Sequence, residues 1–295
     1  QPNYQRWESG AAPIPDAQLK KVATALKTTP EAIMGRHPSI EAGLYDPNVS
    51  DELSYYGEVA VHFAGGGAPL LLSITERELD RLHSALQQDV AFVTVNSLAN
   101  QTVSVRTQAI ADLYFSSEAY DDYGPEDDAY SDHINFQMPD ARDWEIVEAL
   151  WDGGGDLEDF SPSDVKRVQE RIMITDEQYD KLVADGLIKP GDLENERAKN
   201  QDETDRIIQL ATHVVYQLSS GKKRSVWVDD DYATYNAFYD LTEFAGGGPA
   251  SDMIRVAAEG RHRIVFINKS ALDYVSIPTH RYEAGAIEAA AEILE

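Results

Sequence analysis

The sequence has no cysteine among its 295 residues. This absence excludes disulfide bonds, thiolate metal ligands, iron–sulfur clusters and a cysteine nucleophile. No apolar run reaches the ~18–20 residues of a membrane-spanning helix, and the first residues lack the basic-then-apolar pattern of a signal peptide. We therefore expect a cytoplasmic chain with no membrane partner.

Basic residues are scarce: 25 Lys and Arg stand against 52 Asp and Glu, which gives a formal net charge of −27. The first 40 residues are basic on balance, with five basic and three acidic side chains, and the other 255 residues together are strongly acidic. Because the acidic remainder repels polyanions at long range, we expect contact with nucleic acid only through the N-terminal segment. A hydrophobic content of 42% is too high for a disordered chain, so the acidic remainder should fold.

Motifs of enzymes are also missing. The seven histidines form no H-E-x-x-H pair, and there is no G-x-S-x-G elbow. The glycine triplets Gly65–Gly67 and Gly246–Gly248 lack the G-x-G-x-x-G spacing, and Ser220–Arg224 lacks the P-loop pattern. We expect hairpin turns at these places, and we assign no catalytic residue, no metal site and no cofactor.

The N-terminal segment has a clear helical pattern. Leu19, Val22, Ala23 and Leu26 form one apolar stripe, which predicts an amphipathic helix over Asp16–Lys27. Thr29-Pro30-Glu31 is a typical start of a second helix, with a capping residue, a proline at the first position and an acidic side chain. Upstream, the string QPNYQRWESG ends in a glycine stop.

Together these features resemble the second half of a Cro/lambda-repressor-type (XRE family) helix-turn-helix domain, over residues 1–36. The resemblance implies that Gln1, Asn3, Gln5 and Arg6 face the major groove of double-stranded DNA. Gln and Asn pair with adenine edges, and Arg pairs with guanine or phosphate, so these residue types suit base recognition. The two helices that precede the recognition helix in that family have no counterpart here. We expect either that such residues precede Gln1 or that the segment is a degenerate remnant.

After residue 44 the pattern changes to short strands. Strands are predicted over 55–63 and 70–74 as a hairpin, then a helix over 76–88 with a capping box at Thr75–Glu78, then strands over 92–95, 102–105 and 109–115. The string Val105–Leu113 aligns with Ile267–Val275 at an offset of 162, and Phe63–Gly67 recurs at Phe244–Gly248 at an offset of 181. Two interpretations stay open: an internal repeat of two β-rich modules, or coincidence between short strings. The closing strand pairs also resemble those of Sm-like small barrels, and this resemblance implies no RNA-binding residue.

Between the β-rich segments the chain has helical periodicity. Helices are predicted over 143–151, from 161, over 175–186 and over 202–219, and a last helix over 284–294. His213 falls on an apolar helix face in this scheme and is expected in a core or an interface. His262 and His280 stand near Arg261, Arg263 and Arg281, which suggests salt bridges within one chain or between subunits.

The segment Ser116–His133 holds seven acidic residues and no lysine or arginine. Three interpretations stay open: a hard-cation site, a surface for a basic protein, or a solvated loop. It lacks the alternating acids and the central glycine of an EF-hand. Asp152–Asp156 and Asp229–Asp231 raise the same question, with a solvated loop as the simplest interpretation.

We therefore predict an α+β fold in four parts: residues 1–40 as part of a helix-turn-helix domain, 44–140 as a β-rich module with one helix, 141–220 as a helical connector or dimerisation region, and 221–295 as a second β-rich module with a C-terminal helix. The expected function is that of a sequence-specific DNA-binding transcriptional regulator, not an enzyme, with an acidic body for oligomerisation or sensing. Because one such helix reads a half-site, a homo-oligomer is expected. The alternative is an acidic interaction module that binds a basic protein, with a vestigial N-terminal segment.

Overall fold

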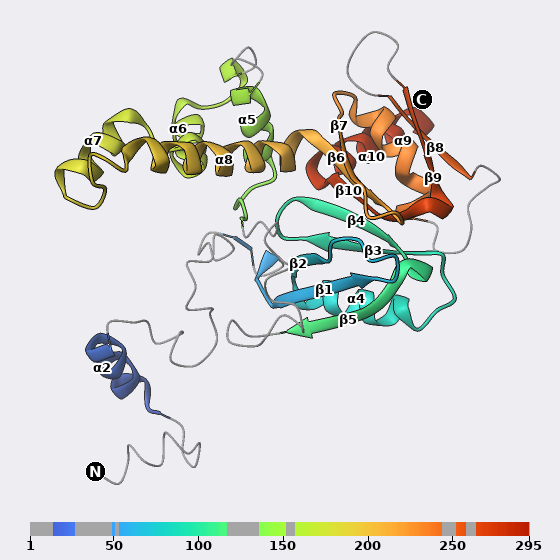
Figure 1. Ribbon diagram of the computed structural model, residues 1–295, viewed down its shortest axis with the longest axis horizontal. Coiled ribbons are helices and arrows are strands. Elements are labelled where there is room, and N and C mark those ends of the chain that lie inside the picture. The colour runs from blue at the N-terminus through green and yellow to red at the C-terminus, as the bar shows by residue number, and fades with distance from the viewer. Residues whose placement is uncertain are drawn as a thin grey trace.

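The computed structural model describes residues 14–26, 49–50, 53–116, 136–151, 157–243, 252–257 and 264–294. Within these ranges the chain forms eight α-helices and three antiparallel sheets, which confirms the predicted α+β class. The sheets have the strand orders β2-β1-β5, β3-β4-β10-β6-β7 and β8-β9 (Figure 1).

The amphipathic helix predicted near the N-terminus is present as α2, Asp16–Leu26. Leu19 and Ala23 on its apolar stripe are buried. Figure 1 shows α2 set apart from the other labelled elements. The predicted second helix start, Thr29-Pro30-Glu31, lies outside the described residues.

The first β-rich part follows the predicted order closely. Thr75 caps the helix after the first hairpin by accepting the N–H of Glu78. The capping box predicted there is only half formed, because the Glu78 carboxylate accepts hydrogen bonds from Arg81 and from the N–H of Asn96 instead. The elements are β1 Gly57–Phe63, β2 Leu70–Ile74, α4 Glu76–Leu86, β3 Phe92–Ser97, β4 Gln101–Arg106, the 3₁₀ turn η2 Thr107–Ala109, and β5 Ile110–Ser116.

Four helices follow, and three of them, α5, α6 and α8, share a separate apolar core with Phe136 and Met138. Ser161 caps α6, and Thr175 and Gln178 form the predicted capping box of α7 with both hydrogen bonds present. Figure 1 shows the longest of these helices, α8, running from α6 and α7 to the five-stranded sheet. The helices are α5 Arg142–Trp151, α6 Pro162–Ile172, α7 Asp176–Ala184 and α8 Leu193–Thr212.

The helix predicted over 202–219 is wrong beyond Thr212. There the backbone changes directly into strand β6, His213–Leu218, which pairs with β10 and β7. The run Val214-Val215-Tyr216 is β-branched and aromatic, and such side chains favour a pleated strand over a helix. His213 is therefore the first residue of a strand and not part of an apolar helix face.

The second β-rich part contains a helix that the sequence pattern did not predict, over Asp231–Thr242. Its signal was Asp230, which caps this helix by accepting the N–H of Ala233, so the aspartate run is not a solvated loop. The last helix begins at Thr279, five residues before the predicted start. The elements after β6 are β7 Lys223–Trp227, α9 Asp231–Thr242, β8 Met253–Ala257, β9 Ile264–Asn268, the 3₁₀ turn η5 Lys269–Ala271, β10 Leu272–Pro278 and α10 Thr279–Leu294.

The two β-rich parts share one order of elements: hairpin, helix, hairpin, 3₁₀ turn and closing strand. The offset of 162 places Thr107–Ala109 on Lys269–Ala271, so the two 3₁₀ turns coincide. Each closing strand pairs with the first strand of its own part, and each pairing has an irregularity at Ala111 or at Asp273, which are 162 residues apart. These features favour an internal repeat over coincidence.

The alignment at an offset of 181 does not fit this repeat. Phe63–Gly67 leads into the turn between β1 and β2, whereas Phe244–Gly248 follows α9 in the chain and lies outside the described residues. The element equivalent to the β1–β2 turn is the β6–β7 turn, which contains Gly221 at a φ of 76°.

Candidate functional site

The residues that the resemblance assigns to DNA contact, Gln1, Asn3, Gln5 and Arg6, lie outside the described residues, as does most of the acidic segment Ser116–His133. His262, Gly246–Gly248 and Asp152–Asp156 lie outside them as well. Within the described residues, polar side chains gather in the body, where helices and sheets of both repeats meet.

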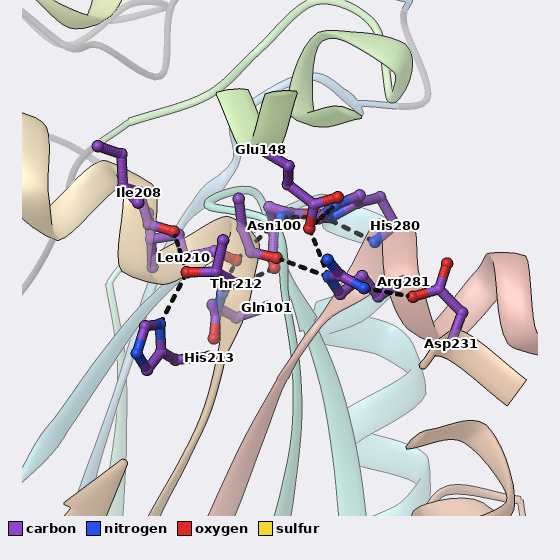
Figure 2. A network of polar contacts seen from close by, with 11 residues as sticks. Asn100, Gln101, Glu148, Ile208, Leu210, Thr212, His213, Asp231, His280 and Arg281 are labelled. Carbon is purple, nitrogen blue, oxygen red and sulfur yellow. Dashed lines mark hydrogen bonds and ion pairs between the residues drawn. The ribbon is translucent and has the colours of Figure 1, made fainter. Parts of the chain in front are cut away.

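A buried polar network occupies the junction between the five-stranded sheet and the helices (Figure 2). Its centre is Asn100, in the turn between β3 and β4, with a φ of 57°. The Asn100 side chain donates to the carbonyl of Leu210 at 3.1 Å and accepts the backbone N–H of His280 at 3.1 Å. Because an asparagine tolerates this left-handed backbone and presents both a donor and an acceptor, it can join α8 to α10 from the tip of a hairpin.

Charged side chains complete the network on its helical side. Nε of Arg281 donates to Glu148, and its Nη1 donates to Asp231 at 2.7 Å. Nε2 of His280 lies 3.1 Å from the same Glu148 carboxylate. Burial raises the pKa of Asp231, and the neighbouring Arg281 opposes this effect. The network thus confirms the predicted salt bridges within one chain for Arg281, and it places His280 beside one of the same carboxylates.

His213 lies at the other side of the network, where α8 becomes β6. Its Nδ1 is 2.7 Å from Oγ1 of Thr212, and its ring lies against Trp227. Burial lowers the pKa of His213 and so favours the neutral ring. This histidine packs at a junction between elements, and the Thr212 hydroxyl beside it donates to the carbonyl of Ile208.

Two cavities flank the network. One, of about 670 Å³, is lined by Glu148, Trp151, Trp227 and Arg281 among others, and the second, of about 440 Å³, reaches His280 from the opposite side. In the second cavity burial raises the pKa of Glu283. Each network carboxylate is paired with Arg281, and the network thereby connects α5, α9 and α10.

A third cavity, of about 420 Å³, lies at the seam between the two repeats. Leu70–Leu72 of β2 form one wall, and Lys223–Ser225 of β7 form another. Arg206 of α8 adds a second guanidinium to the lining, in addition to Arg224, and neither has an ion pair with a carboxylate of the described chain. Apolar walls with basic groups at the margin suit a small anion that has an apolar part.

The sequence pattern missed this cavity, although one signal was present. Lys222-Lys223-Arg224 is a basic run in an acidic chain, and the sequence pattern predicts only a turn there. The turn is confirmed: Ser219–Lys222 connects β6 to β7, so the following Lys223 and Arg224 begin the strand that faces β2 across the cavity.

Elsewhere, the described ranges contain no group of three or more His, Asp or Glu side chains arranged to hold a metal ion. Among the helices described, none combines the length and the apolar character needed to cross a bilayer. No family model matches the chain, and neither a curated protein nor a solved structure is detectably similar to it.

Proposed function

We propose that this chain is a sequence-specific DNA-binding transcriptional regulator whose acidic α+β body serves oligomerisation or sensing. The observation that carries the proposal is the N-terminal pattern, in which QPNYQRWESG is followed by an amphipathic helix. That helix is α2, Asp16–Leu26, at the place where the XRE-type resemblance requires one. The seam cavity gives the body a place for a small anionic effector.

The charge distribution supports the same assignment of DNA contact to the N-terminal segment and of oligomerisation or sensing to the body. The N-terminal 40 residues have five basic and three acidic side chains, while the whole chain carries a net charge of −27. An acidic body weakens non-specific attraction to the phosphate backbone, so that binding depends on base contacts. Gln1, Asn3, Gln5 and Arg6 are the proposed base-contacting residues.

Selection of bound sequences from random duplex DNA, at two salt concentrations, tests the proposal. The protein is used as this chain and also together with any residues that precede Gln1 in its natural form. We expect enrichment of a pseudo-palindromic site. Substitution of Gln1, Asn3 and Arg6 by Ala should abolish the enrichment, and Gln18→Ala, at an exposed position of α2, should preserve it.

Enrichment that survives the triple substitution would refute the assigned residues. If no form of the protein enriches any sequence, the regulator proposal fails. The acidic body would then be tested as a receptor for a basic protein.

A further inference from the structure

The joint between the two repeats is a pairing of strands. β10, the closing strand of the second repeat, pairs with β4 of the first repeat in an antiparallel ladder from Tyr274↔Val105 to Pro278↔Gln101. This pairing merges the strands of both repeats into the five-stranded sheet. The closing strand of one repeat, β10, therefore pairs with the strand just before the 3₁₀ turn of the other repeat, β4.

In the repeat alignment, β5 of the first repeat corresponds to β10, and β9 of the second repeat corresponds to β4. In the described part of the chain, β5 pairs only with β1, and β9 pairs only with β8. Figure 1 shows β5 below β1, at the edge of its sheet, and the β8–β9 ribbon at the right. Among the described strands, β5 and β9 thus each have one open edge, and such edges favour pairing with another chain.

Both of these strands carry exposed apolar side chains. Phe266 on β9 is 59% exposed, whereas its equivalent on β4, Ser104, is 0% exposed. Phe115 on β5 is 37% exposed, and its equivalent on β10, Ile277, is 0% exposed. Tyr114 and Ile264 are large exposed side chains of the same two strands. The copy of each strand that is paired across the joint is buried, and the unpaired copy presents apolar surface to solvent.

We propose that a second copy of this chain pairs its β5 with β9, so that copies associate head to tail through a repetition of the joint seen within one chain. Because the two surfaces differ, the interface is heterologous, and successive copies form a closed ring or an open filament. The inference does not depend on DNA binding by the N-terminal segment.

The internal joint also fixes the register between copies. Shifting each strand by 162 residues converts Ser276↔Val103 into Tyr114↔Val265, and Ile277↔Thr102 into Phe115↔Ile264. Residues directly opposite in an antiparallel pair have Cα atoms about 4.5–5.5 Å apart, which is within reach of a disulfide bond.

Cysteine cross-linking tests this register cleanly, because the chain has no cysteine of its own. The variant with both Tyr114→Cys and Val265→Cys should give, on mild oxidation, covalent species at multiples of 32.7 kDa. Phe115→Cys with Ile264→Cys provides a second pair. Hydrogen-bonded and non-hydrogen-bonded pairs alternate along an antiparallel ladder, so one of the two variants tests each kind. Asp112→Cys with Ile264→Cys is the matched control, since the register places these residues about 10 Å apart along the strands.

Variants with a single cysteine distinguish a head-to-tail interface from an interface with two-fold symmetry. Neither Tyr114→Cys nor Val265→Cys alone should cross-link, whereas an equimolar mixture of the two should stop at the covalent dimer. Self-linking of one single variant, or equal cross-linking of the Asp112/Ile264 control, would overturn the proposal.

The mass of the unmodified protein supplies an independent measurement. Light scattering should give a mass well above 32.7 kDa, and Phe266→Lys should restore the monomer while circular dichroism stays unchanged. Leu187→Lys, at an exposed apolar residue between α7 and α8, should leave the assembly intact. The proposal would be overturned if the mass stayed that of the monomer over a 100-fold range of protein concentration. It would also be overturned if the assembly persisted in the Phe266→Lys variant.

Discussion

Arg281 joins three helices that are far apart in the sequence. From α10 it reaches Glu148 on α5 and Asp231 on α9, and its side chain is only 12% exposed. Removing one partner of such a buried group leaves unpaired charges in a poorly solvated place, which costs much more than the loss of a surface pair.

Arg281→Met should therefore lower the free energy of unfolding by about 3 kcal/mol, measured by urea denaturation. The matched control is Arg142→Met, because Arg142 and its partner Glu145 are 66% and 52% exposed and lie 3.7 Å apart. That change should cost about 1 kcal/mol or less. Equal losses in the two variants would show that the network does not fasten the helices.

The elements meet closely where α10 crosses the start of α9. A Cβ at Gly285 would lie 2.2 Å from the carbonyl oxygen of Asp231 and 2.8 Å from Cβ of Tyr235. Glycine is therefore required at this crossing for space and not for an unusual backbone angle. The same crossing holds Asp231 in reach of Arg281.

Gly285→Ala should separate the two helices and destabilise the protein by about 1–3 kcal/mol, as overpacking does in other cores. Gly191→Ala is the control, since no atom lies within 4 Å of the added methyl group there. Thermal unfolding of both variants checks the prediction. A melting temperature of Gly285→Ala equal to that of the control would mean that the helices separate without cost.

The whole molecule combines a strong negative charge with two apolar strand edges. Each copy carries a net charge of −27, so association through β5 and β9 works against mutual repulsion. Added salt screens this repulsion, with a Debye length of about 10 Å at 0.1 M.

Self-association should therefore strengthen as sodium chloride rises from about 20 mM to about 300 mM, measured by sedimentation equilibrium. An interface held by charge pairs would show the opposite trend. Leu187→Lys should follow the same salt dependence as the unmodified chain, because Leu187 is an exposed residue between α7 and α8 and belongs to neither strand. Dissociation at high salt would contradict an apolar joint between acidic copies.

The sequence by itself determined the elements whose signals are local. Periodicity, capping residues and turn residues act within a few positions of the chain. They predict helix α2, the hairpin of β1 and β2, the caps of α6 and α7, and the two strand–turn–strand strings. The short apolar run after Thr212 fits both a helix and a strand, and only its pairing with β10 and β7 decided for the strand.

Only the tertiary structure decided how the two repeats join and which side chains meet. No local pattern indicates that β10 pairs with β4, that Arg281 reaches Glu148 and Asp231, or that Lys223 and Arg224 border a cavity beside Arg206. These contacts join residues up to 180 positions apart, as Asn100 and His280 are. They depend on strand register and helix packing over the whole body, because each is selected by the burial of distant apolar surfaces and not by the properties of the residues nearby.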